Sequence, residues 1–439
     1  MPVFDSLPAG VRESVVAAGT AGGDRVFAGI ATQNRRWRPL RPPMLTAAMY
    51  QHIHEVSDRL QLLILRACQR RASTAGELCA VLRVDPATLP MLDPDEPLTE
   101  HLLQSMRPDV LLAGGVPKVV EFNGDSSLGG VFDSDTTAAR FLAEFQRAGI
   151  VATRPMSTPP SGVDVRYEVV RDVLGLSEGS RLALIFSLDI GYPGSDDPRA
   201  FVKALDPVCE RGGAAGLDVV AAPTRWLSLA DDGRLLADGV AVDAVLRLTI
   251  PDADDPGMAA VRDALAAGTA RMFTSVAAYL LGNKQILGWL WTDLALLDPT
   301  DADVVTTHVP FSTTLDAITM DQAIAGRGEL VLKPAGGFGG TDVVIGIEAR
   351  PEQWRAALDA AVHSGRPFVL QEFVEPDRLR MHFGNLESGA TEVADVAYSI
   401  GAFRYGRRPA GGVCRFGSPD SSLVLNIGRG AHVTGILLV

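Results

Sequence analysis

The sequence predicts a mixed α/β (α+β) protein with more than one domain, and three observations support this prediction. The chain has 439 residues, which at about 150 residues per domain indicates roughly two to four domains. Strand-like and helix-like patterns alternate between residues 165 and 250, as in a parallel α/β unit. Residues 107–127 and 329–347 each have the pattern of two strands joined by a glycine-rich turn, which adds antiparallel sheet.

The composition argues against several classes of protein. Hydrophobic residues make up 47% of the chain and charged residues 21%, as in a globular protein. The net charge of −13 disfavours nucleic-acid binding, because contacts to phosphates need a basic surface. No stretch resembles a membrane span or a signal peptide, and the four scattered cysteines form no CxxC pair. We therefore expect a cytoplasmic protein with reduced thiols that binds neither nucleic acid nor membrane.

The first hundred residues are expected to be largely helical. Between residues 43 and 67 apolar side chains recur at steps of three and four, which predicts a long amphipathic helix. Residues 74–77 have the spacing of a capping box, and Asp85 starts a second helix-like segment. Residues 74–92 resemble the recognition part of a helix-turn-helix, but the acidic charge and the lack of a basic second helix disfavour that alternative.

A predicted β-hairpin around the turn at Gly114–Pro117 holds the candidate metal site. If its loop is the five residues 113–117, Asp109 pairs with Glu121, and Arg107 pairs with Asn123. Side chains alternate between the two faces of a strand, so these polar residues share one face. The apolar residues of both strands then form the core face: Val110, Leu112, Val120 and Phe122.

Two carboxylates that face each other on paired strands repel unless a positive charge lies between them. A divalent cation would fill that role. The oxygens of Asp109, Glu121 and Asn123 are ligands that Mg²⁺ accepts while it keeps waters and phosphate oxygens in its other positions. Arg107 would lie beside the metal, on the phosphate side. The alternative is an exposed hairpin whose acids bind nothing, with an Asx-type turn over residues 123–125.

The middle of the chain has the alternating pattern of an α/β unit. A helix is expected over 132–148, and the segment 154–161, RPMSTPPS, marks a boundary. Buried strands are expected at 181–188 and 217–222, with a helix over 198–211 between them; residues 226–250 add a hairpin and another strand. The loop DIGYPG (189–194) lacks the spacing of a dinucleotide site. Its position at the carboxyl end of a strand nevertheless makes it a candidate substrate loop.

The last third of the chain contains two lysines in positions suited to phosphate binding. Lys284 begins an apolar helix, and Lys333 lies on a strand that runs into a loop with four glycines. Such a loop lets backbone N–H groups approach phosphate oxygens, and the lysine adds a point charge. The alternative is a flexible hairpin turn without a ligand. The strand 366–375 runs into polar residues as a nucleotide-base hinge would, and residues 394–426 add a second sheet that includes Arg415.

Together these segments resemble the ATP-grasp ligases, specifically the glutathionylspermidine-synthetase-like group. The resemblance covers roughly residues 105–430, and its first element is Arg107-x-Asp109 followed by Glu121-x-Asn123. The other matching elements are GNK at 282–284, LVLKPAGGFGG at 330–340, VLQEF at 369–373 and GGVCR at 411–415. In that group the acidic strand pair precedes the phosphate-binding lysines, a circular permutation of the usual order. Phe338 departs from the pattern, because some relatives have serine or arginine there.

The resemblance implies a role for each matching residue. The ligands of two Mg²⁺ ions that bridge the ATP phosphates would be Asp109, Glu121 and Asn123. The contacts to ATP would come from Lys284, Lys333, the lid glycines Gly336, Gly337, Gly339 and Gly340, and the adenine-reading residues Gln371, Glu372, Phe373 and Val374. Arg107 and Arg415 would neutralise the transferred γ-phosphate, and Ser126 would lie near the acceptor carboxylate.

The implied activity is that of an ATP-dependent, ADP-forming carboxylate–amine ligase, which makes an amide (peptide) bond through an acyl phosphate. Its substrates would be a small carboxylate and an amine; glutathione and spermidine are the named pair of that group, but nothing in the sequence specifies them. Two alternatives remain open: an ATP-dependent phosphotransferase that forms no amide, and a non-catalytic nucleotide-binding protein. The oligomeric state is open as well, with a homodimer as one option.

The expected architecture is an ATP-grasp fold with a pre-ATP-grasp α/β unit and a helical N-terminal segment. The helical segment would span residues 1–105, and the metal-binding hairpin with its following helix would span 106–160. The pre-ATP-grasp-like unit would span 161–280, and the nucleotide-binding sheets with the glycine-rich lid would span 281–439.

Overall fold

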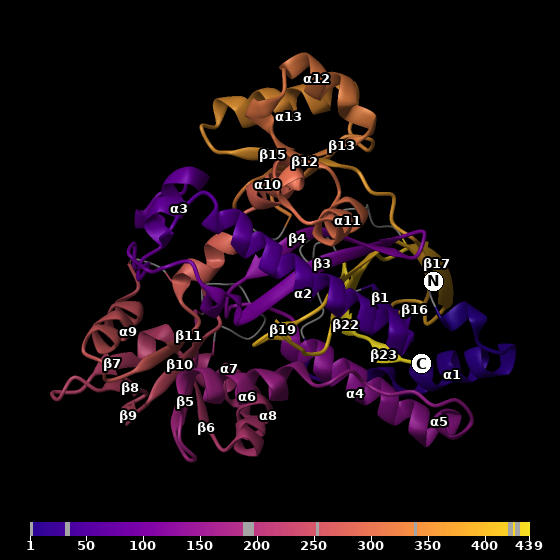
Figure 1. Cartoon of the computed structure of the whole chain (residues 1–439). Coiled ribbons are helices and arrows are strands. Elements are labelled where there is room, and N and C mark those ends of the chain that lie inside the picture. The colour runs from indigo at the N-terminus through magenta and orange to yellow at the C-terminus, as the bar shows by residue number, and fades with distance from the viewer. Residues whose placement is uncertain are drawn as a thin grey trace.

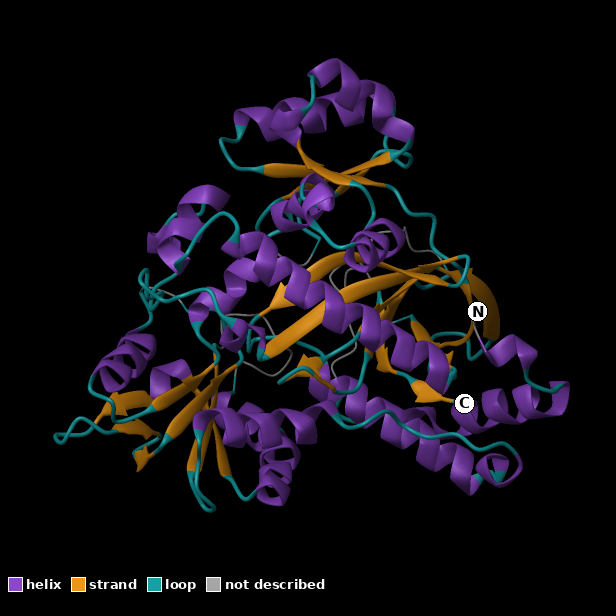
Figure 2. Ribbon diagram, viewed as in Figure 1, coloured by secondary structure: helices purple, strands orange, loops and turns teal. Residues whose placement is uncertain are grey.

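A computed structural model of the chain describes residues 3–30, 36–187, 197–251, 254–337, 340–419, 425 and 431–439 (Figure 1). The loop 189–194, Phe338 and Gly339 lie outside the described residues. Figure 2 shows helices packed around several separate sheets, which confirms the predicted mixed α/β (α+β) class. Among the described residues, no helix has the length and apolar content that a membrane span requires.

The N-terminal hundred residues are largely helical, as predicted. Their elements are η1 (Val3–Ser6), α1 (Ala9–Val26), α2 (Ala47–Gln69), α3 (Ala75–Leu82), η2 (Pro86–Thr88) and η3 (Glu100–Leu103), with the short strands β1 (Trp37–Pro39) and β2 (Met44–Leu45). Helix α2 is the predicted amphipathic helix, and the Thr46 side chain caps it by accepting a hydrogen bond from the Met49 N–H. After α3 the described residues 83–104 form two 3₁₀ turns and no second α-helix, so the helix-turn-helix alternative is wrong.

The central sheet is built around the predicted hairpin. It contains β3 (Ser105–Ala113), β4 (Val116–Gly124), β18 (Tyr398–Gly401), β19 (Arg404–Tyr405), β20 (Arg408–Pro409), β21 (Val413–Phe416) and β22 (His432–Gly435). Strand β3 pairs with β4 along one edge and with β18 and β19 along the other. Helix α2 crosses in front of β3 in Figure 1, and α4 (Val131–Arg147) packs on β22. Residues more than 270 positions apart therefore meet in one sheet.

Two small sheets lie beside the central one. The first consists of β1, β16 (Leu379–Asn385) and β17 (Thr391–Val396), all antiparallel. The second pairs β2 with β23 (Leu437–Leu438) in parallel, which brings the two ends of the chain together (Figure 1). Both sheets connect the N-terminal segment to the C-terminal strands.

The middle of the chain forms the predicted parallel sheet. Its order is β11 (Arg271–Phe273), β10 (Ala244–Arg247), β5 (Arg181–Phe186), β6 (Asp218–Pro223), and all neighbours are parallel. Its helices are α6 (Gly162–Leu174), α7 (Pro198–Ala204), α8 (Asp206–Glu210) and α9 (Pro256–Ala266); η4 (Arg211–Ala215) and η5 (Thr224–Trp226) are short turns. Helix α5 (Ile150–Thr153) instead packs against α4 and α1, away from this sheet (Figure 1). The expected hairpin is formed by β7 (Leu227–Leu229), β8 (Leu235–Ala237) and β9 (Val240–Ala241).

One predicted helix is interrupted. The single helix expected over 198–211 is divided into α7 and α8, with Leu205 between them. Pro207 explains the division, because it lacks the N–H that a continuous helix would use and is tolerated in the first turn of a new helix.

The last lobe lies above the hairpin in Figure 1. Its antiparallel sheet has the order β12 (Ser312–Thr314), β15 (Phe368–Glu372), β13 (Leu330–Pro334), β14 (Val344–Ile345). Its other elements are η6 (Val276–Gly282), α10 (Gln285–Thr292), η7 (Leu294–Leu296), α11 (Pro299–His308), η8 (Leu315–Ala317), α12 (Met320–Ala325), η9 (Gly326–Gly328) and α13 (Pro351–His363). One face of the sheet packs on α12 and α13 through a core that includes Leu332, Leu370 and Trp354. The alternate residues of the strands are therefore free to form the wall of a pocket.

Candidate functional site

The hairpin pairs the two acids as the sequence predicts, although its tip differs. Asp109 lies opposite Glu121, and Arg107 lies opposite Asn123. The expected five-residue loop is wrong, because the turn consists of Gly114 and Gly115, whose φ angles are +59° and +79°. Two consecutive positive φ angles are what a two-residue hairpin turn requires, and glycine adopts them without strain. A bulge beside Asp109 shifts the register back by one residue, so the two deviations cancel at the acids.

The bulge also corrects one residue of the predicted core face. Val110, Leu112 and Phe122 are buried as expected, but Val119 takes the core position that Val120 was predicted to fill. An extra residue in one strand moves the following side chain to the opposite face. Val120 accordingly lines the pocket beside Glu121.

Both acids are paired with cationic side chains from distant parts of the chain. The Asp109 carboxylate lies 2.8 Å from an Arg415 terminal nitrogen and 3.3 Å from Arg107 Nε. The Glu121 carboxylate lies 3.1 Å from Lys284 Nζ. Among the described atoms, Asp109 Oδ1 and Arg107 Nε are buried without a hydrogen-bond partner. These two atoms lie 3.3 Å apart without the geometry of a hydrogen bond, and a buried polar atom without such a bond is costly.

The arginines keep Asp109 ionised despite its burial. Burial alone would raise the pKa of the Asp109 carboxyl, but Arg415 and then Arg107 outweigh it, so the pKa is lowered. Conversely, the Asp109 charge is the main cause that raises the pKa of Arg415. Asp109 and Arg415 therefore keep each other ionised, whereas burial, and then the charge of Arg415, lower the pKa of Arg107.

The two predicted lysines meet at the hairpin. Lys284 follows η6, and its Nζ donates to the Gly337 carbonyl at 2.9 Å as well as contacting Glu121. Lys333 Nζ donates to Gln371 Oε1 at 2.6 Å and to the Val120 carbonyl at 3.4 Å. No described carboxylate lies within 4.0 Å of Lys333 Nζ. Burial lowers the pKa of Lys333 to about 8.

Lys333 and the polar residues of the hairpin line a pocket of about 330 Å³, a size that suits a small ligand, and Lys284 lies beside it on Glu121. Its polar side chains are Arg107, Asp109, Glu121, Asn123, Lys333, Gln371, Glu372, Ser399 and Arg415. Its apolar side chains include Leu111, Val120, Val331, Val343, Ile345, Phe373, Val374, Pro376 and Tyr398. Charged groups and an apolar wall in one pocket suit a ligand with a charged part and an aromatic or aliphatic part.

The predicted base-reading segment 371–374 lines the pocket, but most of its hydrogen-bonding groups are already used. The Glu372 N–H donates to the Phe311 carbonyl and the Phe373 N–H donates to the Glu329 carbonyl, both at 2.7 Å. The Gln371 side chain holds Lys333. The Val374 N–H has no described hydrogen-bond partner, which makes it the group of this segment best suited to bind a ligand.

The other predicted residues are distributed around the pocket. Gly340 lines it, and Gly337 and Gly340 have positive φ angles of +94° and +69° that favour glycine. Gly336 and Gly337 are exposed, and Gly339 is not among the described residues. Ser126 is buried and does not line the pocket; its hydroxyl lies 3.5 Å from Asp125.

Sequence reasoning missed the buried pair formed by Asp125 and Arg247. The two guanidinium nitrogens of Arg247 donate to the two Asp125 oxygens at 3.0 and 2.9 Å, and the Arg247 side chain is fully buried. Arg247 ends β10, so the pair joins the carboxyl edge of the parallel sheet to the end of β4. The position of Arg247 at the end of a predicted strand could have indicated its importance, because functional side chains gather at the carboxyl ends of parallel strands.

The hairpin residues suit magnesium, provided that a substrate completes the coordination shell. No described group of three or more His, Cys, Asp or Glu side chains forms a metal site. The predicted set has two carboxylates and one amide, and the Asn123 nitrogen donates to the Arg107 carbonyl, which leaves its oxygen as the ligand. Hard oxygens and an unpartnered Asp109 Oδ1 fit Mg²⁺ that keeps phosphate and water in its remaining positions.

Comparisons with known proteins show a likeness in fold. No family model matches the chain, and no curated protein matches it. A solved glutathione synthetase-like effector from Globodera pallida superposes with a TM-score of 0.58 at 12% identity, covering 97% of each chain. D-alanyl-alanine synthetase A from Vibrio cholerae matches 59% of this chain and 88% of its own (TM-score 0.29, 11% identity). A RimK-domain ATP-grasp protein from Sphaerobacter thermophilus matches 53% of this chain and 89% of its own (TM-score 0.26, 18% identity).

The chain therefore has the ATP-grasp fold that its motifs predict. More particularly, it has the fold of a glutathione synthetase-like protein over nearly its whole length. At this low identity the likeness concerns the fold alone, so the activity has to be argued from the pocket.

Proposed function

We propose that the protein is an ATP-dependent carboxylate–amine ligase that forms an amide bond through an acyl phosphate and releases ADP and phosphate. The observation that carries this proposal is the paired acids Asp109 and Glu121, set among cations in the pocket that Lys333 also lines. A fold kept for packing alone would gain little from such a cluster, because desolvating paired charges costs as much as their attraction returns.

The charge balance of the cluster favours a polyanionic ligand. Arg107, Arg415, Lys284 and Lys333 surround Asp109 and Glu121, and Glu372 also lines the pocket, so positive charges exceed negative ones by one. A partly buried pocket with excess positive charge attracts anions, and a triphosphate would supply the missing negative charge. Mg²⁺ held by Asp109, Glu121 and Asn123 would, when bound, neutralise charge that develops on the phosphate oxygens.

The side chains around this cluster would divide the remaining work. The Val374 N–H and the apolar wall would hold the base, while Lys284 and Lys333 would bind the phosphates. Arg107 and Arg415 would align the γ-phosphate with the substrate carboxylate. Phosphoryl transfer depends mainly on such positioning and charge neutralisation, so it needs no nucleophilic side chain.

The proposed reaction has two steps. A carboxylate oxygen of the acid attacks the γ-phosphorus while the bond to the β-phosphate oxygen breaks, which gives ADP and an acyl phosphate. The amine then attacks the acyl carbon, loses a proton and expels phosphate. The Arg107 and Arg415 guanidinium groups would stabilise the negative charge that develops in both steps.

One assay tests the proposal against its two alternatives. Protein, ATP and Mg²⁺ are incubated with panels of small acids and amines, including amino acids, peptides and polyamines, and ADP and product masses are measured. A ligase releases ADP when both substrates are present, and its product has their summed mass less water. ADP release with a phosphorylated product and no amide would indicate a phosphotransferase. Nucleotide binding without turnover over the whole panel would indicate a non-catalytic protein.

Matched variants connect that assay to the pocket. Arg107→Ala should abolish most of the turnover, because it removes a cation that touches the transferred group. Arg408→Ala, which removes an exposed cation paired with Glu168 on the surface, should leave turnover unchanged. Equal activity of the two variants would contradict the assignment of the site.

A further inference from the structure

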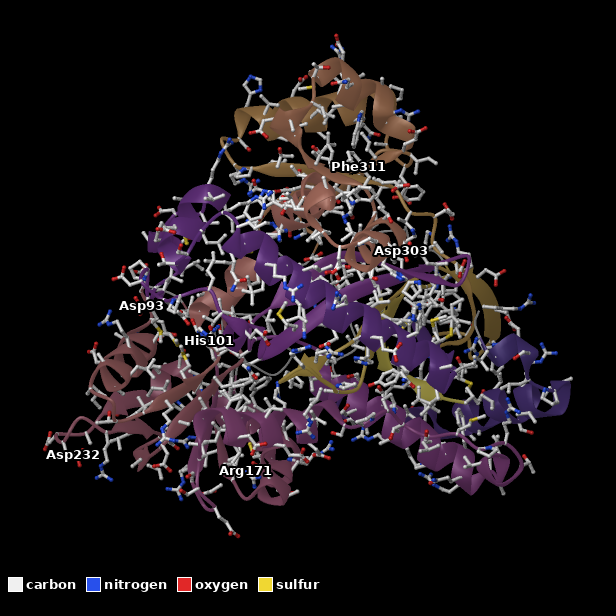
Figure 3. All side chains as sticks on the ribbon, in the orientation of Figure 1. Asp93, His101, Arg171, Asp232, Asp303 and Phe311 are labelled. Carbon is white, nitrogen blue, oxygen red and sulfur yellow. The ribbon has the colours of Figure 1, made fainter. Side chains whose placement is uncertain are left out.

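Three hydrogen bonds connect the backbone at Pro310 to the Lys333 ammonium group. The Ser312 hydroxyl donates to the Pro310 carbonyl at 2.9 Å, and Gln371 Nε2 donates to Ser312 Oγ at 3.0 Å. Lys333 Nζ then donates to Gln371 Oε1 at 2.6 Å. Ser312 and Gln371 are each 2% exposed, so water does not compete for these bonds. Phe311, labelled in Figure 3 at the base of the upper lobe, precedes Ser312 at the start of β12.

The sheet register brings the three side chains to one face. Ser312 on β12 lies opposite Gln371 on β15. Gln371 lies two residues from Val369, the residue opposite Lys333 on β13, so both point to the same side. This is the face that lines the pocket, because Lys333 and Gln371 are part of the pocket wall.

The chemistry of the groups fixes the direction of every bond. The Pro310 carbonyl can only accept, so the Ser312 hydroxyl hydrogen is committed to it. The Ser312 oxygen can then only accept a hydrogen bond, so the group of Gln371 that faces it must be the amide nitrogen, which donates. The Gln371 amide oxygen must therefore face Lys333, whose ammonium group can only donate. Without the Ser312 hydroxyl, the amide could rotate and turn its own N–H groups toward Lys333.

We propose that Ser312 is a positioning residue: through Gln371 it holds the Lys333 ammonium group in place for a nucleotide phosphate. The inference rests on the proposed function, because it assigns Lys333 a phosphate ligand. Gln371 was expected to read adenine, and this arrangement gives its side chain the task of holding the lysine instead.

Lys333 is sensitive to the loss of this contact. Burial lowers the pKa of Lys333 to about 8. The negative charges of Glu121 and Asp109 raise this pKa, and the positive charge of Lys284 lowers it further. The Gln371 oxygen stabilises the protonated form. Removal of the oxygen should therefore lower the pKa further, so that at pH 8 a smaller fraction of Lys333 carries its charge.

The test follows the titration of Lys333 in the ligand-free protein. The chain has lysines at 118, 203, 284 and 333, so reductive methylation with ¹³C-formaldehyde gives a few NMR signals, assigned by substitution. In Ser312→Ala the Lys333 midpoint should fall by roughly one pH unit, the size expected for a lost hydrogen bond to a charge. Ser312→Thr, which keeps the hydroxyl, should restore it, and the signal of Lys203 should not move.

A binding measurement then separates this inference from the proposed function. ADP affinity should fall about fivefold in Ser312→Ala at pH 8, as the charged fraction of Lys333 does, and less at pH 6.5, where Lys333 stays largely charged. Failure of the wild-type protein to bind ADP or ATP would refute the proposed function, whatever the titration shows. An unchanged Lys333 midpoint in Ser312→Ala, or an equal fall in Ser312→Thr, would overturn the positioning role. If Ser312→Ala does not fold, Gln371→Met removes the amide oxygen that Ser312 is proposed to orient toward Lys333, and the Lys333 midpoint must fall in that variant.

Discussion

Replacement of Arg415 by alanine should destabilise the protein in a way that depends on pH. Arg415 lies 2.8 Å from Asp109, and the two side chains are 19% and 13% exposed. Breaking a buried ion pair by removing one partner costs about 3–5 kcal/mol, since the other charge stays buried. Arg107 remains 3.3 Å from Asp109, so we expect the lower end, about 3 kcal/mol at pH 7.5.

The pH dependence follows from the pKa of Asp109. In the wild type this pKa is lowered, because the arginines outweigh burial, so ionised Asp109 stabilises the folded state above its unfolded pKa. That contribution is lost as the pH falls through the folded pKa. Without Arg415, burial should dominate and raise the pKa, so the carboxylate becomes destabilising at neutral pH. Near pH 5 the variant can bind a proton and recover part of the loss.

The assay is urea denaturation of wild type and variant at pH 7.5 and pH 5. The difference in unfolding free energy should be smaller at pH 5 by about 1 kcal/mol or more. Arg408→Ala, which breaks an exposed pair with Glu168, should cost about 0.5 kcal/mol or less at either pH. A loss in Arg415→Ala that is the same at both pH values would refute the argument, because it would show that Asp109 does not depend on Arg415 for its ionisation.

Three further outcomes are expected. Glu121→Gln should lower kcat by roughly 10²–10³ while circular dichroism shows an intact fold, and near-normal turnover would contradict the assignment of the site. As a control, Lys203→Ala should change the unfolding free energy by less than about 0.5 kcal/mol. Asp125→Asn should cost about 3–5 kcal/mol in denaturation, because it leaves the buried Arg247 charge without its partner; a loss below about 1 kcal/mol would contradict this. Magnesium alone should not raise the melting temperature, since cations already neutralise both acids, but Mg²⁺ with ADP should; stabilisation by the metal alone would refute the charge argument.

The pairing of Asp109 with Glu121 was predicted correctly, although part of the reasoning behind the prediction was wrong. Alternation predicted that Asp109 faces Glu121, and the structure agrees. The predicted loop was too long, and the bulge that compensates for it has no clear signature in the sequence. Val120 was therefore assigned to the wrong face, although the acids beside it were assigned correctly. A register error of one residue reverses every side chain until a second shift corrects it.

The sequence by itself determined the elements that depend on local periodicity and turn chemistry. These are the long helix α2, the strands β5, β6 and β10 of the parallel sheet, the hairpin β3–β4 and the lysine strand β13. The fold itself was predicted from the resemblance of the motifs to a known family. Helical and extended periods are properties of neighbouring residues, so a single sequence contains them.

The tertiary structure alone decided which charges meet. Arg415 reaches Asp109 across 306 positions of the chain, and Arg247 reaches Asp125 across 122. Such pairs follow from the order of strands in the sheets and from a bulge that moves the register by one residue. Ser312 likewise acquires its partner because β12 pairs with β15. The spacing of residues along the chain contains no information about these partners, because they are set when distant strands pair.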